Sequence, residues 1–235
     1  MNEFFNSPAF VIAFTFAVYY GAQVLQKKTN KIILNPILVS VVIIIGALKV
    51  MGISYENYHE GCQMIEFLLK PAVVAMGVPL YHQLEKIKKQ TIAIIVSQAV
   101  GCIVSIVSVV IIARLMGASK EVVLSLAPKS VTTPIAIEVS NSIGGIPALT
   151  AFIVIFVGIF GSIFGYAIMH GTRVKNPVSQ GLSMGTAAHA VGTSRSMEIS
   201  PRFGAFSSLG LIMNGILTAL LAPYIVQLVF SVFNL

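Results

Sequence analysis

The sequence predicts an all-α, polytopic membrane protein with six to eight transmembrane segments, two of them interrupted or re-entrant. Three observations support this fold class. The 235-residue chain is 56% hydrophobic and only 10% charged, with a mean hydropathy of +0.90, whereas water-soluble domains carry about 25% charged residues. Several apolar runs reach the roughly 20 residues that a helix needs to cross the hydrocarbon core. Two further segments are apolar but contain prolines or glycines together with charged side chains.

Five apolar runs are long enough for one crossing each: 8–26, 32–52, 91–115, 146–170 and 203–233. The first run lacks the basic leader and small-residue cleavage site of a signal peptide, so we expect it to remain as a helix. The last run exceeds one crossing, and Asn214, Gly215 and Pro223 can kink or tilt it. The segment 64–82 is shorter and contains two prolines, but the charge pattern requires it to cross as well.

Positive charge predicts the orientation of the chain. The short connections 26–31 and 82–90 are strongly basic, which is typical of cytoplasmic loops. The connection 52–66 carries glutamates and no lysine or arginine, as expected on the outer side. These assignments place the N-terminus outside.

Two segments, 121–142 and 178–197, are too polar or too broken for simple crossings. If 121–142 dips into the membrane and returns, the loop 170–177 with Arg173 and Lys175 falls on the cytoplasmic side, as its charge favours. We therefore expect six full crossings plus two re-entrant segments that enter from opposite faces. The alternative is eight crossings, two of them broken.

The order of the segments suggests a duplication within one integral membrane domain spanning residues 1–235. The halves 1–117 and 118–235 each contain four segments, and in each half a proline- or glycine-interrupted segment precedes a long apolar helix. We expect an inverted structural repeat. Interrupted segments in corresponding positions point to the binding site of a transporter.

The first broken segment has the chemistry of an anion site. Non-helical backbone at membrane depth must lie inside the protein or line a water-filled cavity. Thr133 can cap a half-helix that begins at Pro134, and its positive end then points at Lys129. Lys129 could bind a carboxylate there or could merely pair with Glu138, which is also a candidate coupling residue. Three neighbouring hydroxyls complete the predicted substrate-binding set: Ser130, Thr132 and Thr133.

The second broken segment, "GTAAHAVGTSR", repeats this chemistry with other residues. Its predicted substrate-binding side chains are Thr186, His189, Thr193 and Arg195. His189 can change charge near neutral pH and is a second candidate for coupling. The alternatives are a core histidine with satisfied hydrogen bonds, hydroxyls that bond to freed backbone groups, and an arginine that only anchors the topology.

Two long stretches, "LAPKSVTTPIAIEVSNSIGGIPALTA" and "GTAAHAVGTSRSMEI", resemble the signature stretches of the LrgB/CidB family. The hydrophobic layout is similar along nearly the whole chain. The resemblance implies a multi-pass protein of the bacterial cytoplasmic (inner) membrane, often encoded beside a smaller LrgA/CidA-type partner. Family members were described as holin/antiholin-like modulators of murein hydrolase export and lysis. Plastid relatives exchange glycolate and glycerate, and some bacterial members are associated with pyruvate uptake.

The residues and the resemblance together predict a transporter of small 2-hydroxy or 2-oxo monocarboxylates, such as glycolate, glycerate, pyruvate or lactate, that works by alternating access. The alternative is a holin/antiholin-like component that modulates murein hydrolase activity and lysis with a LrgA/CidA-type partner. We expect a homo-oligomer in the bilayer. An enzyme is not expected, because GxSxG, HExxH and paired aspartates are absent. Cys62 and Cys102 lack metal-site spacing, and no cofactor or nucleic acid is predicted.

Overall fold

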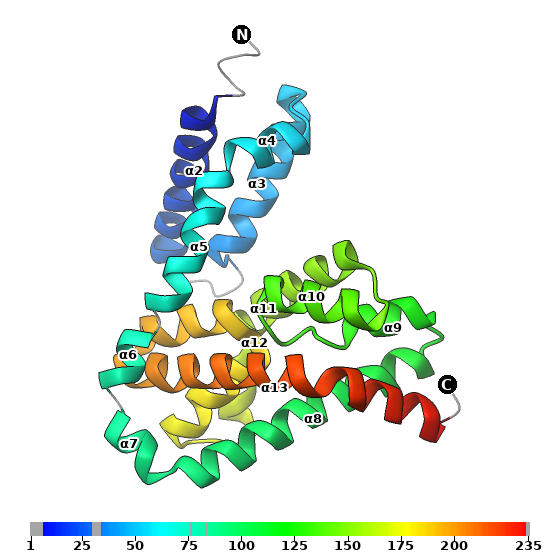
Figure 1. Ribbon diagram of the computed structural model, residues 1–235. Coiled ribbons are helices and arrows are strands. Elements are labelled where there is room, and N and C mark those ends of the chain that lie inside the picture. The colour runs from blue at the N-terminus through cyan, green and yellow to red at the C-terminus, as the bar shows by residue number, and fades with distance from the viewer. Residues whose placement is uncertain (1–6, 30–33, 76, 83, 234–235) are drawn as a thin grey trace. The chain divides into compact units, whose positions relative to one another are not determined.

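The computed structural model describes residues 7–29, 34–75, 77–82 and 84–233, and within these ranges it contains helices and no strands (Figure 1). In chain order the helices are α2 (Pro8–Thr29), α3 (Pro36–Met51), α4 (Tyr55–Gly61), α5 (Gln63–Ala75), α6 (Gly77–His82), α7 (Leu84–Lys89), α8 (Thr91–Leu115), α9 (Lys120–Leu126), α10 (Thr133–Ile143), α11 (Pro147–Gly171), α12 (Pro177–Ile199) and α13 (Pro201–Phe233). The chain divides into two compact units, 1–75 and 76–235, which we describe separately.

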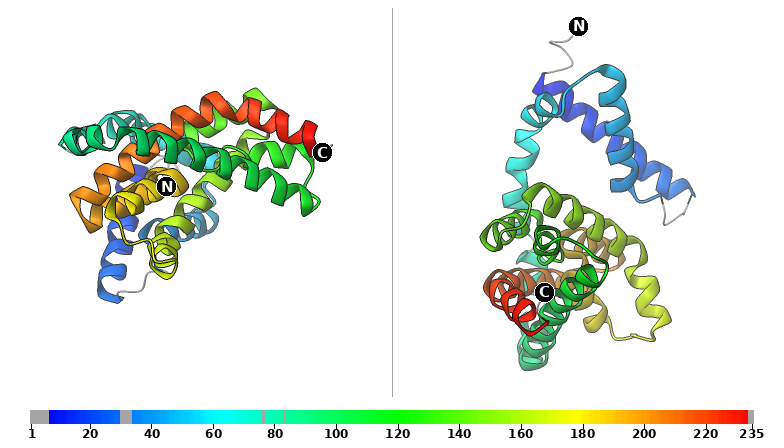
Figure 2. Two further views of the ribbon diagram at one scale, coloured as in Figure 1. Left: turned by 90° about the horizontal axis from the view of Figure 1, so that it is seen from below. Right: turned by 90° about the vertical axis from the view of Figure 1, so that its right-hand side faces the viewer.

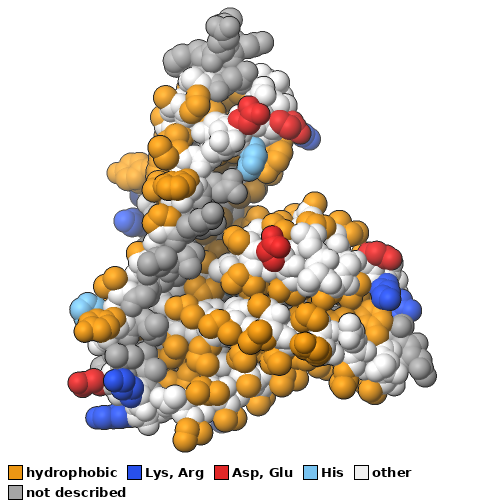
Figure 3. All heavy atoms as spheres, in the orientation of Figure 1, with side chains coloured by type: hydrophobic (Ala, Val, Ile, Leu, Met, Phe, Trp, Pro, Cys, Tyr) orange, Lys and Arg blue, Asp and Glu red, His pale blue; other side chains and the backbone are white. Residues whose placement is uncertain are grey.

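Four helices are long and apolar enough to cross a membrane by themselves, namely α2, α8, α11 and α13. They confirm four of the six expected full crossings. In the second unit hydrophobic side chains cover most of the face seen in Figure 3, and the charged ones are few and lie mainly toward its ends. This surface is the one expected of a protein that presents its sides to hydrocarbon rather than to water.

The first unit is built on the pairing of α2 with α3. The Asn35 side chain caps α3 by accepting a hydrogen bond from the Ile37 N–H (2.9 Å). Gly52 ends α3 in the left-handed conformation that glycine adopts without steric cost. The chain then bends by 119° into α4, which lies where the sequence predicted only a polar connection. A hydrogen bond between Thr15 and Tyr58 (2.8 Å) holds α4 against α2.

Two predicted crossings have a different form in the structure. The run 32–52 yields α3, a helix of 16 residues, which starts after residues 30–33 that lie outside the described ranges. The segment 64–82 yields two helices, α5 and α6, and residue 76 between them is likewise outside the described ranges. The two prolines noted in the sequence lie inside these helices, Pro71 in α5 and Pro79 in α6, and neither marks a helix end.

The second unit contains the first re-entrant segment, α9 and α10, which we call the first hairpin (120–146). Its arms are separated by a non-helical break at residues 127–132. The Ile146 N–H donates to Ser125 Oγ (2.7 Å), and Thr150 donates to Ser140 Oγ (2.7 Å) beside it. The end of α10 thus returns to α9, so the segment enters and leaves at the same end of the unit. The chain folds back here as a re-entrant segment requires, and its entry from one membrane face stays a prediction.

The second re-entrant segment is α12, which we call the second hairpin (177–199). His189 has non-helical torsions (φ 42°, ψ −135°) and divides an inward arm (177–188) from a return arm (190–199). A Cβ atom on Gly192 would lie 2.9 Å from the Met184 carbonyl oxygen, although eight residues of a straight helix span about 12 Å. The return arm therefore folds back onto the inward arm. α12 also lies beside α13 over its length (Figures 1 and 2).

The two hairpins enter from opposite ends of α8. The C-terminal half of α8 shares a buried apolar cluster with the first hairpin and the end of α13, including Val110, Val123 and Val226. The N-terminal end of α8 shares a different cluster with the second hairpin through Ile94 and Val178. The hairpins therefore lie at opposite ends of α8, as the predicted entry from opposite membrane faces requires.

A repeat is visible inside the second unit. The first hairpin is followed by α11, which leaves the C-terminal end of α8, and the second hairpin is followed by α13, which runs back toward that end. The unit thus contains two hairpin–helix pairs, 120–171 and 177–233, whose long helices run in opposite directions. The repeat with halves 1–117 and 118–235, and the single domain 1–235, stay predictions.

The close packing of α12 on α13 generates the first testable prediction. A Cβ on Gly185 would overlap the Ser207 carbonyl oxygen, so we expect Gly185→Ala to destabilise the fold by about 1–3 kcal/mol through overpacking. The thermal unfolding midpoint of the purified protein in detergent measures this. Gly46→Ala is the matched control, because nothing lies within 4 Å of the added methyl. Equal midpoints for the two variants would contradict the described contact.

Candidate functional site

The breaks of the two hairpins meet at the side chain of Asn214 in α13. Its amide nitrogen donates to the Ser130 carbonyl oxygen (2.9 Å) and to the Thr186 carbonyl oxygen (3.1 Å). One buried amide group therefore reaches the backbone of both hairpins, at two residues that are 56 positions apart in sequence. The two broken segments therefore lie next to each other inside the protein.

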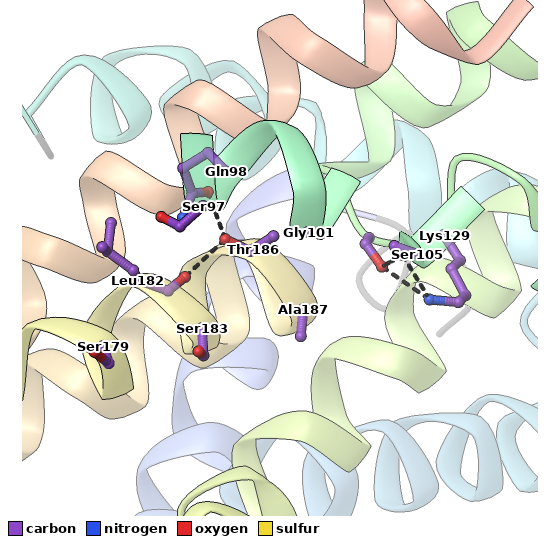
Figure 4. A pocket seen from close by; sticks show the side chains of 11 residues that line it. Ser97, Gln98, Gly101, Ser105, Lys129, Ser179, Leu182, Ser183, Thr186 and Ala187 are labelled. Atoms are coloured by element: carbon purple, nitrogen blue, oxygen red, sulfur yellow. Dashed lines mark hydrogen bonds between the residues drawn. The ribbon is translucent and has the colours of Figure 1, made fainter. Parts of the chain in front are cut away.

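Lys129 extends from the break of the first hairpin toward the middle of α8. Its ammonium donates to Ser105 Oγ (3.1 Å) and to Ser130 Oγ (3.0 Å), and these two hydroxyls are themselves 3.0 Å apart (Figure 4). In the part of the chain that the structure describes, no carboxylate pairs with it. An ammonium has three donors, so one remains for a further partner.

A cavity of ≈ 320 Å³ lies between α8 and the inward arm of the second hairpin, and Lys129 and Ser130 close its inner end. We call it the hydroxyl cavity, because polar side chains line it: Ser97, Gln98, Ser105, Ser179, Ser183 and Thr186 (Figure 4). The Thr186 hydroxyl lies 2.6 Å from Gln98 Oε1 and 2.7 Å from the Leu182 carbonyl oxygen. It can donate to only one of them at a time, so the Gln98 carboxamide and the Leu182 carbonyl compete for this one hydroxyl proton.

A second cavity of ≈ 310 Å³ lies on the other side of the same arm, against α11. We call it the apolar cavity, because hydrophobic residues such as Val157 and Phe160 form most of its wall. Both cavities are lined by Lys129, Ser183 and Ala187. The ammonium thus sits where a polar and an apolar space meet.

The hydroxyl cavity approaches the end of the unit at which α8 and α12 begin. Its lining runs from Ser179, in the first turn of α12, to Lys129 at the break of the first hairpin. Beyond Lys129 the hydrogen bond between Ser105 and Ser130 and the apolar cluster around Val110 fill the interior. Through the hydroxyl cavity, Lys129 is therefore reached from the end at which α8 and α12 begin.

Three predicted site residues line the cavities, namely Lys129, Ser130 and Thr186. The predicted cap is wrong by one residue: α10 begins at Thr133, Thr132 occupies the N-cap position, and no side chain caps the helix. The reason is that Thr132 keeps an extended backbone (φ −65°, ψ 149°) while Thr133 is already helical. Neither threonine lines the hydroxyl cavity or the apolar cavity.

His189, at the turn of the second hairpin, and Thr193, on its return arm, line neither of the two cavities. The buried His189 ring places Nε2 2.8 Å from the Val154 carbonyl oxygen of α11. The Thr193 hydroxyl lies 2.9 Å from the His189 carbonyl oxygen and 2.9 Å from Ser207 Oγ. These contacts match the alternative of a core histidine and a hydroxyl that bonds to freed backbone. A role in binding or coupling stays a prediction.

The two remaining predicted residues point away from the lysine. Arg195 forms an ion pair with Glu198 (2.7 Å) on an exposed part of the return arm. Glu138 is exposed on α10 and lines neither cavity. The predicted alternative of a Lys129–Glu138 pair is absent from the described residues. The proposed binding role of Arg195 and coupling role of Glu138 stay predictions.

Sequence reasoning missed three residues that build the site: Gln98, Ser105 and Asn214. The first two share one face of α8, because small or polar residues recur at positions 97, 98, 101 and 105 with helical spacing. That stripe was present in a run treated only as an apolar crossing. Asn214 was noted only as a cause of kinking, although a buried amide in an apolar helix needs partners of its own.

An all-helical chain with two opposed re-entrant hairpins that meet around a lysine is a multi-pass membrane protein with an internal polar site. The chain belongs to the LrgB-like family, whose model matches residues 15–228. It is 35% identical to the holin-like protein CidB of Staphylococcus epidermidis over 228 residues, covering 97% of this chain and 99% of CidB.

Other relatives cover the chain almost as completely. The Bacillus subtilis protein YwbG is 36% identical over 213 residues, covering 91% of this chain and 95% of YwbG. A Haemophilus influenzae protein is 36% identical over 223 residues, covering 94% of this chain and 96% of its own length. No solved structure matches the chain.

The double contact of Asn214 generates the second prediction. Replacing Asn214 with Ala leaves two buried carbonyl groups without their donor, and each such loss costs about 1–3 kcal/mol. Asn214→Asp should cost more, because a carboxylate would face two carbonyl oxygens. The unfolding midpoint in detergent measures both, and Asn141→Ala, on the exposed side of α10, is the control. A wild-type midpoint for Asn214→Asp would show that this amide does not join the hairpins.

Proposed function

We propose that the protein is a secondary transporter of small carboxylate anions, in particular 2-hydroxy or 2-oxo monocarboxylates. One observation carries this proposal: the ammonium of Lys129 lies at the meeting point of two interrupted hairpins without an acidic partner among the described residues. Interrupted helices that frame a polar site near the centre of a membrane domain are typical of secondary transporters.

The chemistry of the hydroxyl cavity suits such a substrate. Its carboxylate accepts the remaining donor of Lys129, a charge-assisted hydrogen bond that is stronger than a neutral one. The carboxylate also neutralises an ammonium whose partial burial is otherwise costly. The substrate's 2-hydroxyl or 2-oxo group forms a hydrogen bond with Ser183 or with the Gln98–Thr186 pair. At ≈ 320 Å³ the cavity lies at the small end of the usual range for ligand sites, about 300–1,000 Å³.

Alternating access in this proposal uses the two hairpin–helix pairs. Their opposite entry means that movement of one pair against the other opens Lys129 to one end and closes it to the other. Glu138 and His189 remain candidates for coupling, acting from outside the cavities. In this proposal the protein lies in the bacterial inner membrane. The basic connections favour a cytoplasmic position for the end at which α8 begins, with the N-terminus outside.

A second candidate function is a holin-like membrane component that modulates murein hydrolase activity and lysis. The printed name of the CidB relatives favours this function more directly than it favours transport. Such a component would act as a homo-oligomer or together with a LrgA/CidA-type partner. The internal lysine and its hydroxyls are not required for a non-selective pore, and this is why the geometry favours transport.

Flux through proteoliposomes distinguishes the two functions. A transporter takes up radiolabelled glycolate or pyruvate and retains an entrapped fluorescent dye. A pore-forming component releases the dye. Dye release without saturable uptake would replace the first proposal with the second.

Lys129 generates the third prediction. Lys129→Ala should lower carboxylate uptake by at least about tenfold, because a hydrogen bond to a charged group contributes about 1.5–3 kcal/mol. Lys129→Arg should retain part of the activity, since the charge persists. Lys175→Ala, in an exposed loop outside both cavities, is the control. Unchanged uptake in Lys129→Ala would remove the proposed substrate site.

The orientation generates the fourth prediction. In a Cys62→Ser, Cys102→Ala background, a cysteine introduced by Lys175→Cys should react with a membrane-impermeant thiol reagent only after the cells are opened. A cysteine introduced by Ala118→Cys, at the other end of α8, should react in intact cells. The reverse pattern would invert the proposed topology, and labelling of both from one side would contradict the opposite ends of the hairpins.

A further inference from the structure

The apolar cavity reaches the same lysine as the hydroxyl cavity but has a different wall. Val157, Phe160 and Met169 of α11 face Met184 and Ala188 of the second hairpin across it. Apart from Lys129 and Ser183, the described side chains around this space carry no hydrogen-bonding oxygen or nitrogen. A ligand part in this cavity would therefore be held by burial of hydrocarbon and not by hydrogen bonds.

Lys129 joins this wall to a charge. Its two hydrogen bonds within the protein both go to hydroxyls of the other cavity, on Ser105 and Ser130. The described residues of the apolar cavity include no acidic side chain that could pair with it. A cation at the inner end of an apolar space is complementary to an amphipathic anion, in which a carboxylate carries a hydrocarbon chain.

We propose that the apolar cavity is a second arm of the site and takes the hydrocarbon chain of short alkyl carboxylates, with the carboxylate at Lys129. The proposal rests on the proposed function, because both assign Lys129 to a carboxylate. The cavity of ≈ 310 Å³ equals about ten water volumes of roughly 30 Å³. A chain of about four to six carbons fills roughly half of this space, since a methylene group is of similar size to a water molecule.

The exposed outer rim of the apolar cavity admits a second type of occupant, the acyl chain of a membrane lipid. Phe160 and Ile168 are about half exposed, at 49% and 54%, so a membrane lipid could also place an acyl chain in this space. Such a chain would gain nothing from the ammonium. The carboxylate is therefore the group that separates the proposed ligand from hydrocarbon in general.

The experiment measures binding to the purified full-length protein by thermal shift, because a ligand that binds the folded state raises its unfolding midpoint. The probes are sodium salts from acetate to hexanoate at constant ionic strength, with glycolate as the hydroxyl-bearing reference and hexanamide as the uncharged analogue. We expect apparent affinity to rise about fourfold per methylene group until the arm is full, a ratio equivalent to about 0.8 kcal/mol. Hexanamide should give no shift.

Two variants place the chain in the apolar cavity. Val157→Phe fills the cavity and should abolish the dependence on chain length while glycolate binding persists. Ile155→Phe adds the same side chain on the same helix at an exposed position outside both cavities (45% exposed) and should leave the dependence intact. Ile168→Trp, at the half-exposed rim, repeats the test if Val157→Phe does not fold.

Each other result overturns the proposal in a distinguishable way. The same dependence on chain length in Val157→Phe and Ile155→Phe would place the chain elsewhere. Stabilisation by hexanamide equal to that by hexanoate would assign the cavity to uncharged acyl chains. Glycolate binding with no gain for longer carboxylates would leave the proposed function standing and refute the second arm. Absence of binding by glycolate and by every carboxylate would refute both.

Discussion

Helix breaks inside a membrane domain leave backbone groups without their helical partners, and the second unit of this protein is organised around satisfying them. Asn214 does so for both hairpins at once, by donating to one carbonyl oxygen from each. Because buried polar groups without partners are costly, the two breaks and the middle of α13 are held together. The cavities, the lysine and the opposed hairpins all take their positions from that junction.

Close helix packing makes the junction possible. A row of glycines on α11 faces the second hairpin: a Cβ on Gly158 would contact the His189 ring, and those on Gly161 and Gly165 would contact Ala188 and Met184. Small residues of this kind let membrane helices approach each other without a side chain between them. The inward arm of the second hairpin is thereby fixed between α8 and α11, with one cavity on each side of it.

The surroundings of the Lys129 ammonium determine which ligands this site can attract. Lys129 is the lysine that both cavities share, and hydroxyl oxygens rather than carboxylates surround it in the described part of the chain. Hydroxyls solvate an ammonium without neutralising it, so the site remains attractive to an anion. The chain belongs to the LrgB-like family, and its CidB relatives carry a holin-like name. The internal cation is the feature on which the proposal of a small-acid substrate rests.

The sequence alone determined the class of the protein and the two places where its helices break, because composition, apolar run length and the positions of proline and glycine are local properties. It also identified Lys129, since a lysine between prolines in an apolar segment is conspicuous without any partner in view. Only the tertiary structure decided which other side chains build the site around it. Ser105 comes from α8 and bonds Lys129, Gln98 of α8 bonds Thr186, and Asn214 of α13 joins the two hairpins. His189 turned toward α11, although its segment predicted a place in the site. Helical periodicity defines the faces of each helix, but the contacts between faces are selected by the packing of all helices together.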